Sequence, residues 1–256
     1  MAERARANGV DMWALSDHDE LSGLAQAAES AAALGLRFVP GVEVSITFCG
    51  STVHVLGLNI DASHPELVQG LAAARRRRFA RAREIADRLR DCGLGECHEG
   101  ALALARNPDL VSRAHFARYL HEQGRVRSIQ HAFDRYLGEG RPAYAPVQWA
   151  SMEEAVGWIL AAGGKAVIAH PGRYRYTPLQ FDALFERFAA LGGRGIEVVS
   201  GAHTPRQYEE YARVALHYGF EASRGSDFHG PSRGRADLGA LPDLPERLTP
   251  VWHDWI

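Results

Sequence analysis

The sequence has few cysteines and no long apolar segment. Cys49, Cys92 and Cys97 form an odd, sparse set, which disfavours a disulfide framework and favours a reducing compartment, so we expect a cytoplasmic protein. No second pair of metal ligands follows Cys92 and Cys97, so their spacing does not match a structural zinc site. No apolar run approaches the ~20 residues that cross a membrane. The charged N-terminus is not followed by the apolar region of a signal peptide.

The chain also lacks an excess of charge of either sign. Lys and Arg total 29 and Asp and Glu total 31, which gives a formal net charge of −2. This balance argues against a protein that coats nucleic acid or binds a membrane through a polybasic surface. A local arginine-rich segment does occur at 75–83, and we interpret it as a solvated helix face or as a patch that attracts RNA phosphates.

What the chain does contain is an alternation of apolar and helical segments. Apolar segments at 165–169, 195–200 and 220–224 alternate with helical patterns at 152–162, 179–191 and 205–218. This order predicts βα units with a parallel sheet or barrel. In the first half we expect the end of a helix at 1–8, a helix at 21–34, and strands at 10–15, 37–40 and 51–58. Residues 65–150 are more polar, and we predict a helical insertion there between two halves of one α/β domain.

Histidines and carboxylates fall where the predicted strands end. The residues concerned are His18, Glu43, His170, His203, Asp227 and His229. Active sites of (β/α) barrels gather at the carboxyl ends of the strands. Imidazole and carboxylate ligands without thiolates suit manganese, iron or zinc. A carboxylate such as Glu43 can bridge two cations that clamp an in-line displacement at phosphorus. The pattern therefore favours metal-assisted hydrolysis, and by itself it admits phosphate esters and amides alike.

Five motifs resemble, in order, those of the PHP (polymerase and histidinol phosphatase) family. They are Leu-Ser-Asp17-His18-Asp19, Gly-Val-Glu43, Val-His54-Val-Leu-Gly, Ala-His170-Pro-Gly and Gly-Ser-Asp227-Phe-His229. Segments around Arg113 and Arg135 resemble the insertion of the branch that includes bacterial nucleoside 3′,5′-bisphosphate phosphatases and 5′-to-3′ exoribonucleases acting on short RNA. The resemblance implies a distorted seven-stranded (β/α) barrel formed by 1–64 and 151–256, with a helical cap at 65–150.

The resemblance also implies a metal site and a substrate site. Glu43, His54 and His170 would hold one divalent ion, His18 and His229 would contribute to a second, and Asp227 with the bridging Glu43 would contribute to a third. Two or three ions are expected, with Mn²⁺ favoured over Fe²⁺ or Zn²⁺. Glu43, His170 and Asp227 would act in catalysis, and Arg113, Arg135 and His203 would bind substrate. Arginine suits phosphate because its planar, permanently charged fork matches the oxygens.

One family motif has no counterpart in this sequence. The family begins with a strand that carries His-x-His, and no such motif precedes Asp17 and His18. We therefore expect a barrel whose first strand is missing or truncated, which would leave an exposed edge. A misplaced start is the interpretation we favour over a cut chain or a degraded homologue.

The resemblance predicts a metal-dependent phosphoesterase that uses a metal-bound hydroxide. Its substrate would be a phosphomonoester of a nucleotide, of the 3′,5′-bisphosphate type, or the 5′ end of a short RNA. One alternative is a truncated or catalytically lapsed homologue that only binds nucleotide phosphate, and a weaker one is a histidinol-phosphatase-like enzyme. The expected partner is thus a nucleotide or a short oligoribonucleotide, with neither a membrane nor a stable protein partner.

Overall fold

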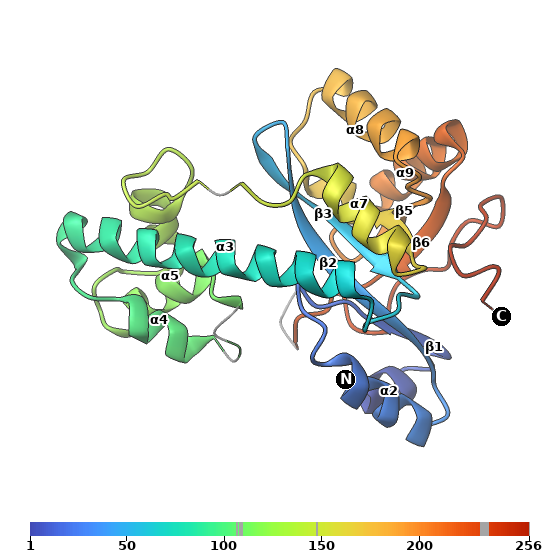
Figure 1. The fold of residues 1–256 in the computed structure, drawn as a ribbon, viewed down its shortest axis with the longest axis horizontal. Helices are drawn as coiled ribbons and strands as arrows, with labels where there is room; N and C mark the ends of the chain where they lie inside the picture. The colour runs from blue at the N-terminus through green and yellow to red at the C-terminus, as the bar shows by residue number, and fades with distance from the viewer. Residues whose placement is uncertain (106, 108–109, 147, 231–235, 256) are drawn as a thin grey trace. The chain divides into compact units, whose positions relative to one another are not determined.

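The computed structural model describes residues 1–105, 107, 110–146, 148–230 and 236–255, which fall into two units (Figure 1). The first unit comprises Met1–Leu71 and Ala150–Ile256, and the second comprises Ala72–Trp149. No helix in the described ranges is both long enough and apolar enough to cross a membrane.

A curled sheet forms the centre of the first unit (Figure 1). Its strands pair in chain order: β1 (Met12–Leu15), β2 (Arg37–Phe48), β3 (Ser51–Leu58), β4 (Lys165–Ile168), β5 (Gly195–Ser200) and β6 (Glu221–Gly225). The pairs β1–β2, β4–β5 and β5–β6 are parallel. The expected α/β class and the curled sheet of a distorted barrel are confirmed, and the described residues contribute six strands to it.

Strand β3 departs from the parallel arrangement that the sequence predicts. It is antiparallel to both β2 and β4. The cause is the connection to β2, where Cys49 (φ 45°) and Gly50 (φ 75°) are both left-handed. Two consecutive left-handed residues form the tight turn of a β-hairpin, and a hairpin must be antiparallel. Strand β2 also runs well beyond the predicted segment 37–40, because its pairing with β3 continues to Phe48.

Helices begin where the sequence supplies capping residues. A capping box starts each of α7 (Met152–Ala161), α8 (Pro178–Ala190) and α9 (Pro205–Tyr218). In each box a Ser or Thr side chain before the helix accepts from the backbone N–H of the third helical residue, and the Glu or Gln side chain of that third residue accepts from the backbone N–H of the Ser or Thr. Proline occupies the first turn of α8 and α9, where a missing N–H costs nothing. The helices of the first unit are α1 (Ala2–Ala7), α2 (Leu24–Ala33), α7 (Met152–Ala161), η4 (Pro171–Arg173), α8 (Pro178–Ala190) and α9 (Pro205–Tyr218).

The second unit is helical and has its own apolar core. Helix α3 (Pro65–Leu89) begins in the first unit and continues into the second. The other helices are η1 (Arg90–Leu94), α4 (His98–Leu104), α5 (Arg113–Glu122), α6 (Ile129–Ala132) and η3 (Phe133–Leu137). Ile85 and Leu89 of α3 share a buried cluster with Phe116 and Leu120 of α5 and with Leu137. The apolar residues Ala82, Ile85 and Leu89, at helical spacing on α3, therefore explain why the second unit has a core of its own.

Candidate metal centre

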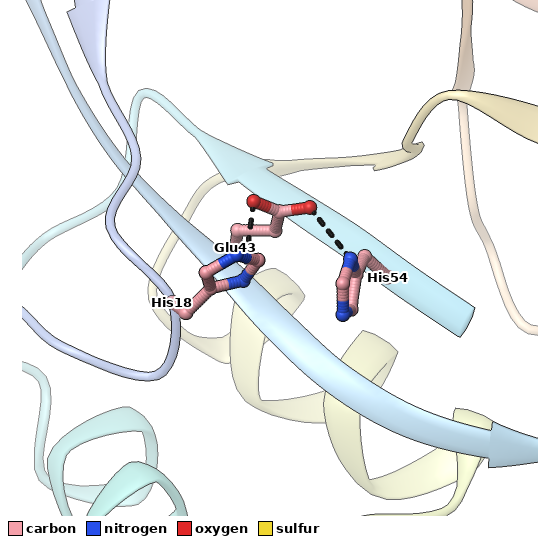
Figure 2. Close-up of side chains that lie close together, drawn as sticks. All are labelled: His18, Glu43 and His54. Carbon is pink, nitrogen blue, oxygen red and sulfur yellow. Dashed lines mark ion pairs between the residues drawn. The ribbon is translucent and has the colours of Figure 1, made fainter. Parts of the chain in front are cut away.

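The loop after β1 and the interior of the β2–β3 hairpin bring His18, Glu43 and His54 together. His18 follows β1, and its loop continues the pairing with β2. Asp19 N donates to Glu43 O (2.9 Å) and Glu43 N donates to Asp17 O (3.0 Å). On the other side, the hairpin register pairs Ser45 with His54, which puts His54 diagonally across from Glu43 on the same face. Figure 2 shows the Glu43 carboxylate between the two imidazoles.

The Glu43 carboxylate is the centre of the cluster. Its Oε1 lies 2.9 Å from His54 Nδ1 and 2.9 Å from His170 Nε2, and its Oε2 lies 3.3 Å from His18 Nδ1. The nitrogens of His54 and His170 are 3.3 Å apart. Four strands or strand-end loops thus direct three imidazoles at one carboxylate.

Burial and charge set the protonation of this cluster. Burial acts to raise the pKa of the Glu43 carboxyl, but the attraction of His54 and hydrogen bonds with His170 and His54 hold that pKa well below its usual range. For His170, burial acts to lower the pKa, and the bond with Glu43 and the charge of Glu197 outweigh it, so the pKa is raised. The site therefore keeps an anion at its centre and attracts positive charge to it.

These residues fit a divalent cation. His18, Glu43 and His54 each offer a ligand atom, and the three atoms lie within 4.8 Å of one another. Neutral imidazole and carboxylate are the ligands of manganese, iron and zinc sites, and a carboxylate is able to bridge two ions. His170, whose Nε2 approaches the same carboxylate oxygen, adds a further nitrogen donor.

Asp227 and His229 follow β6 and lie beside the cluster. His229 Nδ1 lies 2.9 Å from the Asp227 carbonyl oxygen, and the His229 ring is 5.8 Å from the His18 ring. Asp227 Oδ2 accepts from Arg173 Nη1 at 3.2 Å. The structure thus brings together the rings of His18 and His229, the two residues that the sequence predicts to share a metal ion. The assignment of metal ligands stays a prediction for the whole set of His18, Glu43, His54, His170, Asp227 and His229.

Three strand-end residues of this site have left-handed backbones. They are Asp19 (φ 52°), His170 (φ 29°) and Asp227 (φ 51°). Such a conformation costs a non-glycine residue roughly 1–3 kcal/mol and persists only where surrounding contacts impose it. The concentration of such residues around Glu43 is typical of a functional site, where the fold holds side chains in an arrangement that the backbone alone disfavours.

Two buried carboxylates support the site, and the sequence pattern did not identify their roles. Asp19 accepts from Ser45 N (2.8 Å) and Ser45 Oγ (2.9 Å), which fixes the loop that carries His18. Glu197 lies inside β5 and accepts from His170 N at 2.6 Å. Burial raises the pKa of Glu197 to about 7. The signal that could have found Glu197 is its sequence context, because a carboxylate stands in an otherwise apolar strand.

His203, predicted to bind substrate, is engaged within the protein. Its Nε2 accepts from Gly172 N at 3.0 Å, which leaves its Nδ1 to donate to Val198 O at 3.1 Å. The ring is buried and stacks on Tyr211. In this arrangement His203 supports the turn that follows His170, and its contact with substrate stays a prediction.

Arg113 and Arg135, the other predicted substrate residues, belong to the second unit. Arg113 begins α5, donates to Leu137 O at 3.2 Å, and lies 5.3 Å from the centre of the Tyr144 ring. Arg135 is exposed on η3. Burial, and then the charge of Arg113, lower the pKa of Arg81 to about 10. The helical unit therefore concentrates positive charge around Arg113, and the roles of both arginines stay predictions.

Comparison with known proteins places this geometry in context. No family model matches the chain. It is 45% identical over 252 residues to the 3′,5′-nucleoside bisphosphate phosphatase of Chromobacterium violaceum, covering 98% of this chain and 88% of that protein. It is 40% identical over 253 residues to a 5′-3′ exoribonuclease of Haemophilus influenzae, covering 99% and 91%.

Two solved structures share the fold. One, described as an amidohydrolase from Chromobacterium violaceum with bound sulfate and no metal, is 44% identical with a TM-score of 0.91, over 99% of this chain and 88% of that one. The other, from Bifidobacterium adolescentis and described as a metal-dependent phosphoesterase, is 27% identical with a TM-score of 0.78, over 97% and 85%.

Proposed function

Because the chain belongs to the PHP-type metal-dependent phosphoesterases that include the 3′,5′-nucleoside bisphosphate phosphatase and the 5′-3′ exoribonuclease, we propose that it hydrolyses a phosphomonoester of a nucleoside 3′,5′-bisphosphate. The observation that carries this proposal is the cluster at Glu43. One buried carboxylate with two imidazole nitrogens at 2.9 Å and a third at 3.3 Å is a donor set for divalent ions. The 45% identity to a bisphosphate phosphatase supports the choice of substrate.

The proposed ligands are histidines and carboxylates of the sheet strands and of the loops that follow them. They are His18, Glu43, His54, His170, Asp227 and His229, for two or three ions, with Mn²⁺ as the ion we favour. When bound, divalent ions lower the pKa of a water molecule and stabilise negative charge on phosphoryl oxygens. Glu43, His170 and Asp227 are the residues we assign to catalysis through these ions.

The protonation state of the cluster prepares it for this role. The lowered pKa of Glu43 keeps its carboxylate ionised throughout the neutral range. The raised pKa of His170 means that this imidazole keeps its proton to a higher pH than a free histidine, and that proton competes with a metal, because a ligating imidazole is neutral. Loading should therefore become weaker as the pH falls.

The second unit supplies the proposed phosphate-binding arginines. Arg113 and Arg135 would bind substrate phosphate, and a contact of His203 with substrate would require its ring to give up a bond with Gly172 or Val198. A guanidinium–phosphate pair is strong and directional, so it orients the nucleotide as well as binding it. We place the reaction in the cytoplasm, where the three cysteines, all free thiols, stay reduced.

Removal of the 5′ nucleotide of a short RNA is the second candidate function. It is favoured by the 40% identical exoribonuclease and by the arginine-rich part of α3, because phosphate contacts along a strand add affinity. Neither candidate function acts on histidinol phosphate, so this compound is the negative control in the assay.

The test is phosphate or nucleotide release by the full chain with added Mn²⁺. The substrates are adenosine 3′,5′-bisphosphate, 5′-AMP, a 5′-phosphorylated short RNA and histidinol phosphate. The proposal expects release from the bisphosphate and not from 5′-AMP, with loss in His54→Ala and full activity in the matched control His217→Ala, an exposed histidine on α9. Full metal-dependent activity of His54→Ala would show that the site is misassigned.

A further inference from the structure

Glu197 is a buried carboxylate next to the site, and the proposed function leaves it without a role. It stands in the middle of β5, all six residues of which are buried, and only 5% of its own surface is exposed. A carboxylate in such a place must be compensated by hydrogen bonds or charge. Its described contacts go to the loop that follows β4 and to the last residue of β6.

The first contact is with the loop that follows β4. Glu197 Oε2 accepts the backbone N–H of His170 at 2.6 Å. His170 has a left-handed backbone (φ 29°, ψ 57°) and precedes a proline, so its conformation depends on contacts from outside the loop. The bond to Glu197 is such a contact, and from this backbone the His170 imidazole reaches Glu43 at 2.9 Å.

The second contact is with the end of β6. A Cβ added to Gly225 would collide with Glu197 Oε1, so the carboxylate packs directly against this backbone. Gly225 stands two residues before Asp227, which is itself left-handed (φ 51°). A β-bulge lies between Glu197 and Val199 in the pairing of β5 with β6. Bulges re-aim side chains and are common beside active sites.

We propose that Glu197 is a positioning residue that holds His170 and Asp227 in the geometry that binds metal. One buried side chain on β5 contacts the backbone of His170 and that of Gly225, two residues before Asp227, so it links the two ligands to each other. Partners that orient metal ligands contribute about 10- to 100-fold to metal affinity in known sites. This inference rests on the proposed function, because it takes His170 and Asp227 as metal ligands.

The test is calorimetric titration of Mn²⁺ into the metal-free full chain, with melting temperature measured in parallel. We expect Glu197→Ala to bind Mn²⁺ about 10- to 100-fold more weakly. Glu197→Gln keeps the shape and an oxygen that accepts from His170 N, so it should recover most of the affinity. The matched control is Val198→Ala, whose side chain packs in the apolar core, and it should lower the melting temperature without weakening Mn²⁺ binding.

Each result bears on one claim. Affinity in Glu197→Ala equal to that of the parent overturns the inference, and so does an equal loss of affinity in Val198→Ala, because the effect would then be general destabilisation. If Glu197→Ala does not fold, Glu197→Gln must bind Mn²⁺ close to the parent, and a loss as large as that of His170→Ala overturns the inference. Parent-like binding by His170→Ala would overturn the ligand assignment of the proposed function, and the inference with it.

Discussion

Gly172 occupies a position in the turn after His170 where a side chain has no room. An added Cβ would lie 2.5 Å from Gln207 Nε2 and 2.7 Å from His203 Cδ2. Neither neighbour retreats freely, because His203 bonds both Gly172 N and Val198 O, and Gln207 caps α9 while donating to Gly172 O. The substitution Gly172→Ala must therefore move the turn that carries His170.

The size of the effect follows from this overlap. Overpacking of this kind lowers the free energy of unfolding by roughly 1–3 kcal/mol. At about 2–4 °C per kcal/mol for a chain of this size, the melting temperature of Gly172→Ala should fall by about 2–12 °C. A displaced His170 imidazole should also lower kcat/KM for the bisphosphate by about 10- to 100-fold, since misplacement by about 1 Å costs that much in known enzymes.

The assay is thermal unfolding together with Mn²⁺-dependent phosphate release. The matched control is Gly157→Ala, because Gly157 is exposed on α7 with nothing within 4 Å of an added Cβ. This change should raise stability by about 0.5–1 kcal/mol, as alanine does inside a helix, and leave activity unchanged. The reasoning fails if Gly172→Ala melts with the parent and keeps full activity.

Two further predictions concern substrate binding and the ion pair between Arg4 and Asp237. Arg113→Ala should raise KM for the bisphosphate about 10- to 100-fold with kcat largely kept, from the loss of a charged hydrogen bond of about 1.5–3 kcal/mol. The control Arg118→Ala, whose exposed guanidinium pairs with Glu122 at 2.7 Å, should behave as the parent in the same steady-state kinetics, and an unchanged KM in Arg113→Ala would remove the assignment. Hydrogen bonds from Arg4 hold the pKa of Asp237 down at about 2, below the unfolded value of 3.8. Its stabilising contribution is thus complete above the unfolded pKa and is lost as the pH falls from 3.8 towards 2. The urea midpoint of Asp237→Asn should lie below that of the parent at pH 6 and approach it near pH 3, and a gap that widens on acidification would contradict this account.

The positions of the central residues could be predicted because strand ends are visible in the sequence. His18, His170 and Asp227 each follow an apolar segment, and the parallel pairs β1–β2, β4–β5 and β5–β6 bring such ends to one edge. Glu43 and His54 meet for a different reason, the antiparallel register of the β2–β3 hairpin. The sequence did not predict that register, because the cysteine at Cys49 is not a usual turn residue for a left-handed backbone.

The supporting residues could not be predicted, since their roles depend on contacts between distant parts of the chain. Glu197 contacts His170 only because β4 and β5 are neighbours in the sheet. The sequence of β5 shows a carboxylate in an otherwise apolar strand, but it does not indicate the hydrogen-bond partner. His203 looked like a strand-end residue free to bind substrate. In the structure both of its ring nitrogens are used, by Gly172 and Val198, which are far from each other in sequence.

The central claim is that Glu43 and the surrounding imidazoles hold divalent ions that hydrolyse a nucleotide phosphomonoester. The most direct measurement strips the chain with EDTA, restores Mn²⁺, and follows phosphate release from adenosine 3′,5′-bisphosphate. We predict that activity disappears with EDTA and returns with Mn²⁺ in the parent and in Glu210→Gln, an exposed control on α9, and that Glu43→Gln regains less than about one hundredth of it. Full restoration in Glu43→Gln, or activity that survives EDTA, would contradict the account.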